Sequence, residues 1–181
     1  MTANTRMFEN IGMEIQPAQV AMFTSLARML KERHGSQIHL YVRSRVEEDA
    51  YRKNNTDCLW DTVTNGSVHI RALQEEALDD KEVISRARRV EKLVGEPINR
   101  LALPSRQMGH AFAAGAWRHP VAPFVARASN IQLLHALAES VAFWEREIRE
   151  KNLGLVMDGN KFMAATARAL GVPYRRLTLA R

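Results

Sequence analysis

The sequence predicts an α/β protein in which a mainly parallel sheet of about five strands lies between two layers of helices. One reason is that residues 129–181 read as helix, strand, helix and strand, which in so short a span implies a right-handed βαβ crossover. Another is that Leu155-Val156-Met157 is apolar and stops abruptly at Asp158-Gly159-Asn160, as a buried parallel strand does before its loop. In addition, residues 37–43 alternate strictly, which indicates a strand.

The C-terminal helices have clear ends. Ser129 can cap the first helix and we expect Asn152 to stop it, while one face is apolar and the other is charged. The second helix is closed by Gly171 and Pro173. The apolar residues at helical spacing are Ile131, Leu134, Leu137, Ala138, Val141, Trp144 and Ile148 in the first helix, and Phe162, Ala165 and Ala169 in the second.

The N-terminal half continues the alternation of strands and helices. Gly35 ends the first helix, and Ser44 with Glu47 forms a capping box that opens the next. Alternating side chains in VHIRAL predict the third strand. The expected strands are residues 8–15, 37–43, 68–73, 154–157 and 174–179, and the expected helices in this half are residues 18–34, the segment from Ser44, and residues 79–94.

Residues 95–128 interrupt this order. The segment contains the prolines Pro97, Pro104, Pro120 and Pro123, and we expect loops with one short helix around residues 106–114. A long irregular segment in a compact α/β domain is more often functional than accidental.

Composition limits the function classes. A chain of 181 residues is ordinarily one domain, and the single cysteine, Cys58, excludes an internal disulfide and suits a reducing compartment. The chain has no apolar run that could span a bilayer and no signal peptide at residues 1–10, so we expect a cytoplasmic protein. The histidines lack zinc-ligand spacing, and no metal is expected. The net charge of +6 favours anionic partners only weakly, because Lys and Arg are scattered.

No common catalytic or nucleotide-binding motif is present. GxGxxG, GxxxxGK[ST] and GxSxG are all absent, so the candidate residues come from position alone. Ligands of parallel sheets bind beyond the carboxyl ends of the strands. Glu14 there is a general base or hydroxyl-binding group, or else a cap or salt-bridge partner. Asp158 and Asn160 hold a sugar or phosphate, or else form an ordinary turn and N-cap.

The irregular segment adds basic candidates. Arg106, His110, Arg118 and His119 can recognise an anion, although a solvated loop is the simpler account. We predict a cleft lined by Glu14, Arg106, His110, Asp158 and Asn160.

Three stretches resemble a known family. IGMEIQPAQVAMFTSLARMLKERHGSQIHLYV, ALPSRQMGHAFAAG and FWEREIREKNLGLVMDGNKFMAATARALGVPYRRLTLAR are similar to bacterial capsule and surface-polysaccharide biosynthesis proteins. The resemblance implies a Rossmann-like, glycosyltransferase-like N-terminal domain of the GT-B fold. In such proteins the N-terminal domain mostly holds the acceptor, and a C-terminal domain holds the sugar nucleotide.

The resemblance implies a set of expectations. Residues 1–181 would form a single Rossmann-like domain, the N-terminal part of a longer two-domain protein, inactive alone and without a cofactor of its own. The donor would be a sugar nucleotide, and the partners would be a glycan or lipid-linked acceptor and the C-terminal domain. Glu14 or Asp158 would deprotonate the acceptor, and Arg106 or Arg118 would hold an anionic sugar or pyrophosphate. Peripheral association with the inner face of the membrane would follow.

A second function class stays open. The chain can instead be a non-catalytic Rossmann-like module that binds a nucleotide, nucleic acid or a protein partner. We expect no sequence-specific nucleic-acid binding, and binding to arbitrary DNA should vanish at physiological salt. A sugar-nucleotide domain encoded directly after Arg181 would favour the glycosyltransferase.

Overall fold

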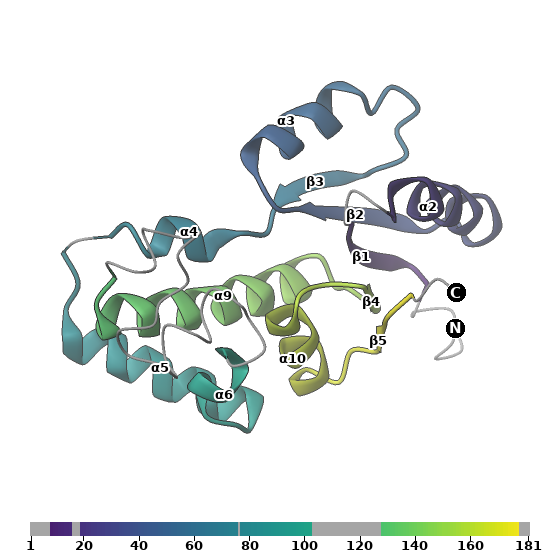
Figure 1. Ribbon diagram of the computed structural model, residues 1–181. Helices are drawn as coiled ribbons and strands as arrows, with labels where there is room; N and C mark the ends of the chain where they lie inside the picture. Colours follow the sequence, from purple (N-terminus) through teal and green to yellow (C-terminus); the bar gives the residue numbers. More distant parts are fainter. Residues whose placement is uncertain (1–7, 16–18, 76, 103–127, 178–181) are drawn as a thin grey trace. The chain divides into compact units, whose positions relative to one another are not determined.

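The protein contains a five-stranded, all-parallel sheet flanked by helices on both faces (Figure 1). The computed structural model describes residues 8–15, 19–75, 77–102 and 128–177. The strand order is β3-β2-β1-β4-β5, and every neighbouring pair is parallel, which confirms the predicted Rossmann-like α/β fold. The strands are β1 (Asn10–Glu14), β2 (Gln37–Val42), β3 (Thr62–Asn65), β4 (Leu155–Met157) and β5 (Tyr174–Arg175).

Side-chain chemistry at the helix ends explains where several helices start and stop. The Ser44 side chain accepts a hydrogen bond from the Glu47 amide at the start of α3, and Asp79 caps α5 in the same way. Gly35 ends α2 in the left-handed conformation that glycine adopts without strain. The described helices are α2 (Val20–His34), α3 (Arg45–Lys53), α4 (Val68–Ala72), α5 (Asp80–Val94), α6 (Ile98–Ala102), α9 (Asn130–Glu150) and α10 (Lys161–Ala169).

The two faces of the sheet differ in chemistry. One face is apolar and packs against α2, which buries Phe23, Ala27 and Leu30 there. Burial of this surface is the main stabilising contribution to the fold. The opposite face carries polar side chains of β1 to β3, including Glu14, His39 and Tyr41. The strand residues in the apolar core are Ile11, Met13, Ile38, Leu40, Val42, Val63, Leu155 and Met157.

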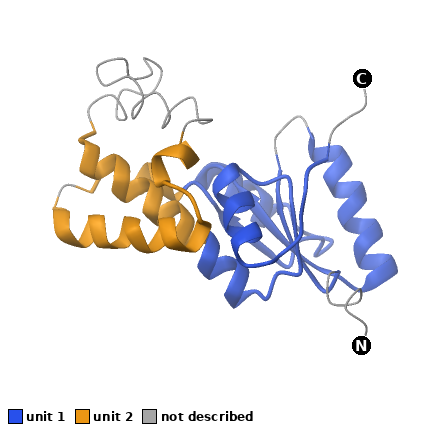
Figure 2. Cartoon of the chain, turned by 90° about the horizontal axis from the view of Figure 1, so that it is seen from below, with its two compact units in different colours: residues 1–67, 144–181 blue, residues 68–143 orange. Residues whose placement is uncertain are grey.

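The chain divides into two compact units (Figure 2). The first consists of residues 1–67 and 144–181 and contains the whole sheet. The second, residues 68–143, is helical in its described part. Within the second unit, Arg86 forms ion pairs with Glu82 and Glu139. The expectation that residues 1–181 form a single domain stays a prediction.

One strand prediction is wrong. Residues 68–73 do not form a strand: Val68–Ala72 is the short helix α4, and the third strand is Thr62–Asn65. An alternation over only six residues is also compatible with one helical turn, in which residues four positions apart share a face. Val68 and Ala72 have this spacing, and Ala72 is buried. The strand itself is too short and too rich in threonine to show a clear apolar pattern.

The other strands lie where they were predicted, with shorter ends. The first spans residues 10–14 of the predicted 8–15, and the last spans residues 174–175 of the predicted 174–179, of which residues 178–179 lie outside the described residues. The short helix predicted around residues 106–114 lies outside the described residues. In the part of the chain that is described, no helix combines the length and the apolar character needed to cross a bilayer.

Candidate functional site

The strand order creates a switch point between β1 and β4. From β1 the sheet continues through β2 to β3 on one side and through β4 to β5 on the other. In open α/β sheets, ligands bind in the crevice beyond the carboxyl ends of the strands at such a point. Glu14 is the last residue of β1, and Asp158 directly follows β4. Both predicted carboxylates therefore lie at the same edge of the sheet, on adjacent strands.

The Glu14 carboxylate is buried and has several partners. It is 5% exposed, and its Oε2 atom accepts hydrogen bonds from the Asn160 backbone amide over 2.7 Å and from Asn160 Nδ2 over 3.0 Å. Its Oε1 atom accepts from Arg43 Nε over 3.3 Å. Burial raises the pKa of Glu14, whereas the Asn160 amide and the Arg43 charge lower it in part. These contacts join β1 to the end of β2 and to the loop after β4.

Asn160 connects this carboxylate to the start of α10. Its Oδ1 atom accepts a hydrogen bond from the Met163 amide over 3.0 Å, so the same side chain that donates to Glu14 also caps the helix. Gly159 is needed beside it because a Cβ atom there would come within 2.9 Å of Met163 Cβ. The loop is therefore packed closely onto the helix.

Asp158 offers an oxygen that no described group binds. Its backbone has a φ of 57°, a left-handed conformation that aspartate tolerates better than most residues. Its Oδ1 atom accepts a hydrogen bond from the Leu177 amide over 3.3 Å. Its Oδ2 atom is buried and has no hydrogen-bond partner among the described residues. Burial is also the main reason why the pKa of this carboxyl group is raised.

The structure brings together three of the predicted site residues: Glu14 and Asn160 are in direct contact, and Asp158 lies two residues before Asn160. Arg106, His110 and Arg118 lie outside the described residues, so their part in the cleft stays a prediction. Arg43 was not among the predicted site residues, although residue 43 ends a predicted strand. Its role as a partner of Glu14 could have been inferred from the adjacency of β1 and β2, which bring Glu14 opposite Tyr41, two residues before Arg43.

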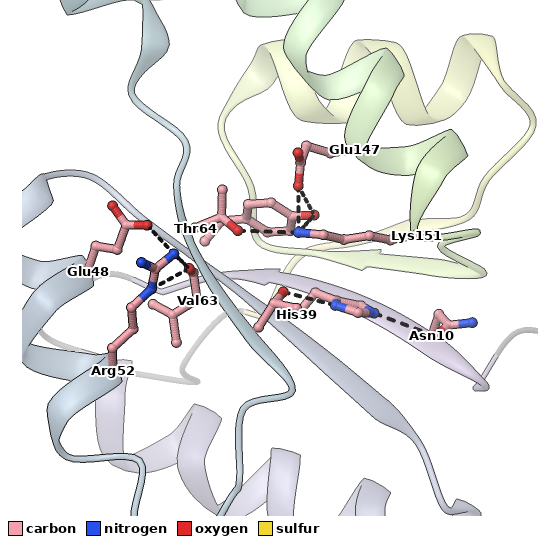
Figure 3. A network of polar contacts seen from close by, with 10 residues as sticks. Asn10, His39, Glu48, Arg52, Val63, Thr64, Glu147 and Lys151 are labelled. Atoms are coloured by element: carbon pink, nitrogen blue, oxygen red, sulfur yellow. Dashed lines mark hydrogen bonds and ion pairs between the residues drawn. The ribbon is translucent and has the colours of Figure 1, made fainter.

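A second polar cluster lies on the same face of the sheet, over β2 and β3 (Figure 3). Lys151 Nζ donates to Glu147 Oε2 over 2.6 Å, to Thr64 Oγ1 over 3.3 Å and to the Tyr41 hydroxyl oxygen over 3.4 Å. The Tyr41 hydroxyl donates to Glu147 over 3.1 Å. Burial and the neighbouring Glu147 raise the pKa of Tyr41. This cluster therefore holds the end of α9 against the sheet.

His39 extends the polar face toward the other end of the strands. Its Nδ1 atom lies 3.0 Å from Thr62 Oγ1, and its Nε2 atom lies 3.5 Å from Asn10 Oδ1 (Figure 3). An open depression of about 540 Å³ lies beside the cluster, and Arg52, Thr62, Thr64 and Lys151 are among the residues that line it. Arg52 donates two hydrogen bonds to the Val63 carbonyl of the edge strand and pairs with Glu48. The charged groups of this depression are thus bound to neighbours within the chain.

The described switch point presents two carboxylates, Glu14 and Asp158, and the amide side chain of Asn160. Among the described residues, no group of three or more His, Cys, Asp or Glu side chains could hold a metal ion. The chain matches no family model, no curated protein and no solved structure. The chemistry of the switch point is therefore the basis for a function.

Proposed function

We propose that this chain is the acceptor-side N-terminal domain of a glycosyltransferase-like protein in bacterial surface or capsular polysaccharide biosynthesis. The observation that supports it is the pair of carboxylates at the switch point, where Asp158 keeps one buried oxygen without a described partner. Glu14 is occupied by Asn160 and Arg43, so Asp158 is the better placed of the two to meet a ligand hydroxyl.

The chemistry of glycosyl transfer uses such a group. An acceptor hydroxyl attacks the anomeric carbon of the donor, the bond from that carbon to the leaving diphosphate breaks, and the hydroxyl proton passes to a base. The half-buried carboxylate of Asp158 would accept this proton. Burial raises the pKa of this carboxyl group, which makes it a stronger base than an ordinary aspartate.

The donor side lies elsewhere in this proposal. A sugar nucleotide would be held by a C-terminal domain of the same protein, with the acceptor, a glycan or lipid-linked saccharide, on this chain. Arg106 and Arg118 would hold an anionic sugar or a pyrophosphate. The proposed location is the cytoplasmic side of the membrane, with peripheral attachment.

Binding of saccharides to the isolated chain tests the proposal. A panel of short capsular oligosaccharides, followed by amide NMR, should shift the Gly159 and Asn160 signals in a saturable way. Asp158→Asn should weaken this binding about tenfold or more, because one hydrogen bond to a charged acceptor contributes about 1.5–3 kcal/mol. The matched control is Asp49→Asn, which removes the same charge from the exposed face of α3 and should leave the affinity unchanged.

Transfer itself is the second readout. In a protein that joins this chain to a sugar-nucleotide-binding domain, Asp158→Asn should lower turnover by about 100-fold or more while the chain remains folded. Oligosaccharides that bind nowhere near Gly159 and Asn160, or normal turnover of the Asp158→Asn variant, would contradict the proposal.

A further inference from the structure

Glu14 occupies a place where this type of fold often receives a phosphate group. The N-terminus of a helix that follows a strand at the switch point presents backbone amides and the positive end of the helix dipole. Here that helix is α10, and the amide at its N-cap, Asn160, donates to Glu14 Oε2 over 2.7 Å. The anion at this position therefore comes from the protein's own chain.

The partners of Glu14 are those that an anion requires. Besides the Asn160 amide, the Asn160 side chain donates over 3.0 Å and Arg43 Nε donates to the second oxygen over 3.3 Å. With 5% exposure, the carboxylate is almost shielded from water. A buried carboxylate is tolerated only when hydrogen bonds and an opposite charge replace its hydration, and these three donors supply both.

A second carboxylate near Glu14 also disfavours the binding of phosphorylated ligands. Asp158, directly after the adjacent strand, brings a second acidic side chain to the same edge, where the charge of Arg176 acts on it. Like charges at short distance repel strongly in a partly buried site. A neutral sugar hydroxyl, by contrast, can donate to the half-buried carboxylate of Asp158 without this penalty.

We propose that Glu14 is a built-in anion that closes the N-terminus of α10 to phosphate groups and leaves the switch point to neutral, hydroxylated ligands. The ligand class rests on the proposed function, whereas the anion role of Glu14 does not. Glu14 is then a positioning residue, which orients Asn160 and α10, and Asp158 is the group that meets the ligand.

Inorganic phosphate is the probe for this role. Wild-type chain and the Glu14→Ala variant are titrated at pH 8 against sodium chloride of equal ionic strength, and the Gly159 and Asn160 amides are followed by NMR. The variant leaves the Asn160 amide and Arg43 without their anion, so it should bind phosphate with a Kd of about 1–10 mM. Formate, which has the size of the missing carboxylate, should bind at the same amides. Wild type should show no saturable shift up to about 50 mM.

The control is Glu32→Ala, which removes a carboxylate from the exposed side of α2 and should behave as wild type. Saturable phosphate binding at these amides in wild type overturns the proposal. So does a folded Glu14→Ala variant in which neither anion binds.

A measurement on the unchanged chain keeps the test decisive if Glu14→Ala does not fold. The Asn160 amide proton should follow the protonation of Glu14, read from its side-chain carboxyl carbon, with the same midpoint. An Asn160 amide that does not follow Glu14 overturns the proposal, and a shared midpoint supports it. If phosphate behaves as expected but no saccharide binds, the proposed function is rejected and the anion role of Glu14 is kept.

Discussion

At the scale of single residues, burial acts in opposite directions on Glu14 and His39. Both side chains are 5% exposed and both lie on the polar face of the sheet. Loss of hydration disfavours the charged form, so it raises the pKa of Glu14 and lowers that of His39. Hydrogen bonds from Asn160 and the charge of Arg43 offset part of this rise in the pKa of Glu14. His39 instead has neutral partners, Thr62 and Asn10, and is held as the uncharged imidazole.

His39 should therefore make the protein sensitive to acid. Burial first, and the nearby Lys151 second, lower its pKa from 6.5 to about 4. Between these values the unfolded chain binds more protons than the folded one, so the free energy of unfolding rises with pH and the gain is complete above the unfolded pKa. The change should be about 1–3 kcal/mol. Urea unfolding between pH 4 and 7 measures it.

The variant His39→Gln keeps a polar side chain but cannot take up a proton in this range. Its free energy of unfolding should depend less on pH over the same window. His34→Gln, at the exposed end of α2, is the matched control and should keep the wild-type profile. An unchanged pH profile for His39→Gln would show that this histidine is not the acid-sensitive group.

At the scale of elements, the start of α10 combines two functions in one residue. Asn160 caps the helix through Oδ1 and holds Glu14 through Nδ2. The N-cap of α3 is simpler: the Ser44 side chain accepts a hydrogen bond from the Glu47 amide. Substitutions at the two caps can therefore distinguish the contribution of helix capping from that of the hydrogen bond between Asn160 and Glu14.

Asn160→Ala should be more costly than an ordinary cap deletion. Loss of a cap costs about 1 kcal/mol, and removal of a partner from a buried carboxylate adds about 1–3 kcal/mol. Ser44→Ala, in the same compact unit, should cost only the first amount. Equilibrium unfolding in urea at pH 7 measures both. Equal losses for the two variants would mean that the Asn160 side chain contributes nothing to holding Glu14.

At the scale of the whole molecule, contacts between distant parts of the chain hold the polar face together. Tyr41 on β2 and Glu147 on α9 are 106 positions apart and share a hydrogen bond, and Lys151 binds both. Glu14 and Asn160 are 146 positions apart. Both contacts link the N-terminal strands to the segment that returns to the sheet after residues 68–143.

Lys151→Met should destabilise the protein more than the loss of a surface ion pair does. The Lys151–Glu147 pair has side chains that are 19% and 10% exposed, so the variant leaves a shielded carboxylate without its cation. The expected loss is about 2–3 kcal/mol. Arg149→Met breaks a pair of the same i,i+4 spacing in which the arginine is 61% exposed, and it should cost under about 1 kcal/mol.

The double variant Lys151→Met/Glu147→Gln completes the test. Removing the uncompensated charge should recover part of the loss, so the two substitutions should not add. Additive losses, or a Lys151→Met variant as stable as Arg149→Met, would show that the pair is not significant for stability.

Much of the fold could be predicted from local patterns, and the one error shows their limit. The alternation of Ile38, Leu40 and Val42 and the abrupt end of Leu155-Val156-Met157 correctly located two strands. Val68–Ala72 was misread because so short a segment satisfies both the strand and the helix period. Of the site, the position of Glu14 and Asp158 at the carboxyl edge followed from parallel strands alone, but the partners of Glu14 did not.

The sequence by itself determined the parallel α/β fold and the edge at which Glu14, Asp158 and Asn160 lie, because strand periodicity and turn chemistry act over a few neighbouring residues. Only the tertiary structure decided that β4 pairs with β1, which places the Asn160 amide on the Glu14 carboxylate. It also decided that β2 lies between β1 and β3, which places Asn10 and Thr62 beside His39. Such contacts depend on which strands become neighbours. That choice is made by the packing of the entire sheet, and no local stretch of sequence contains it.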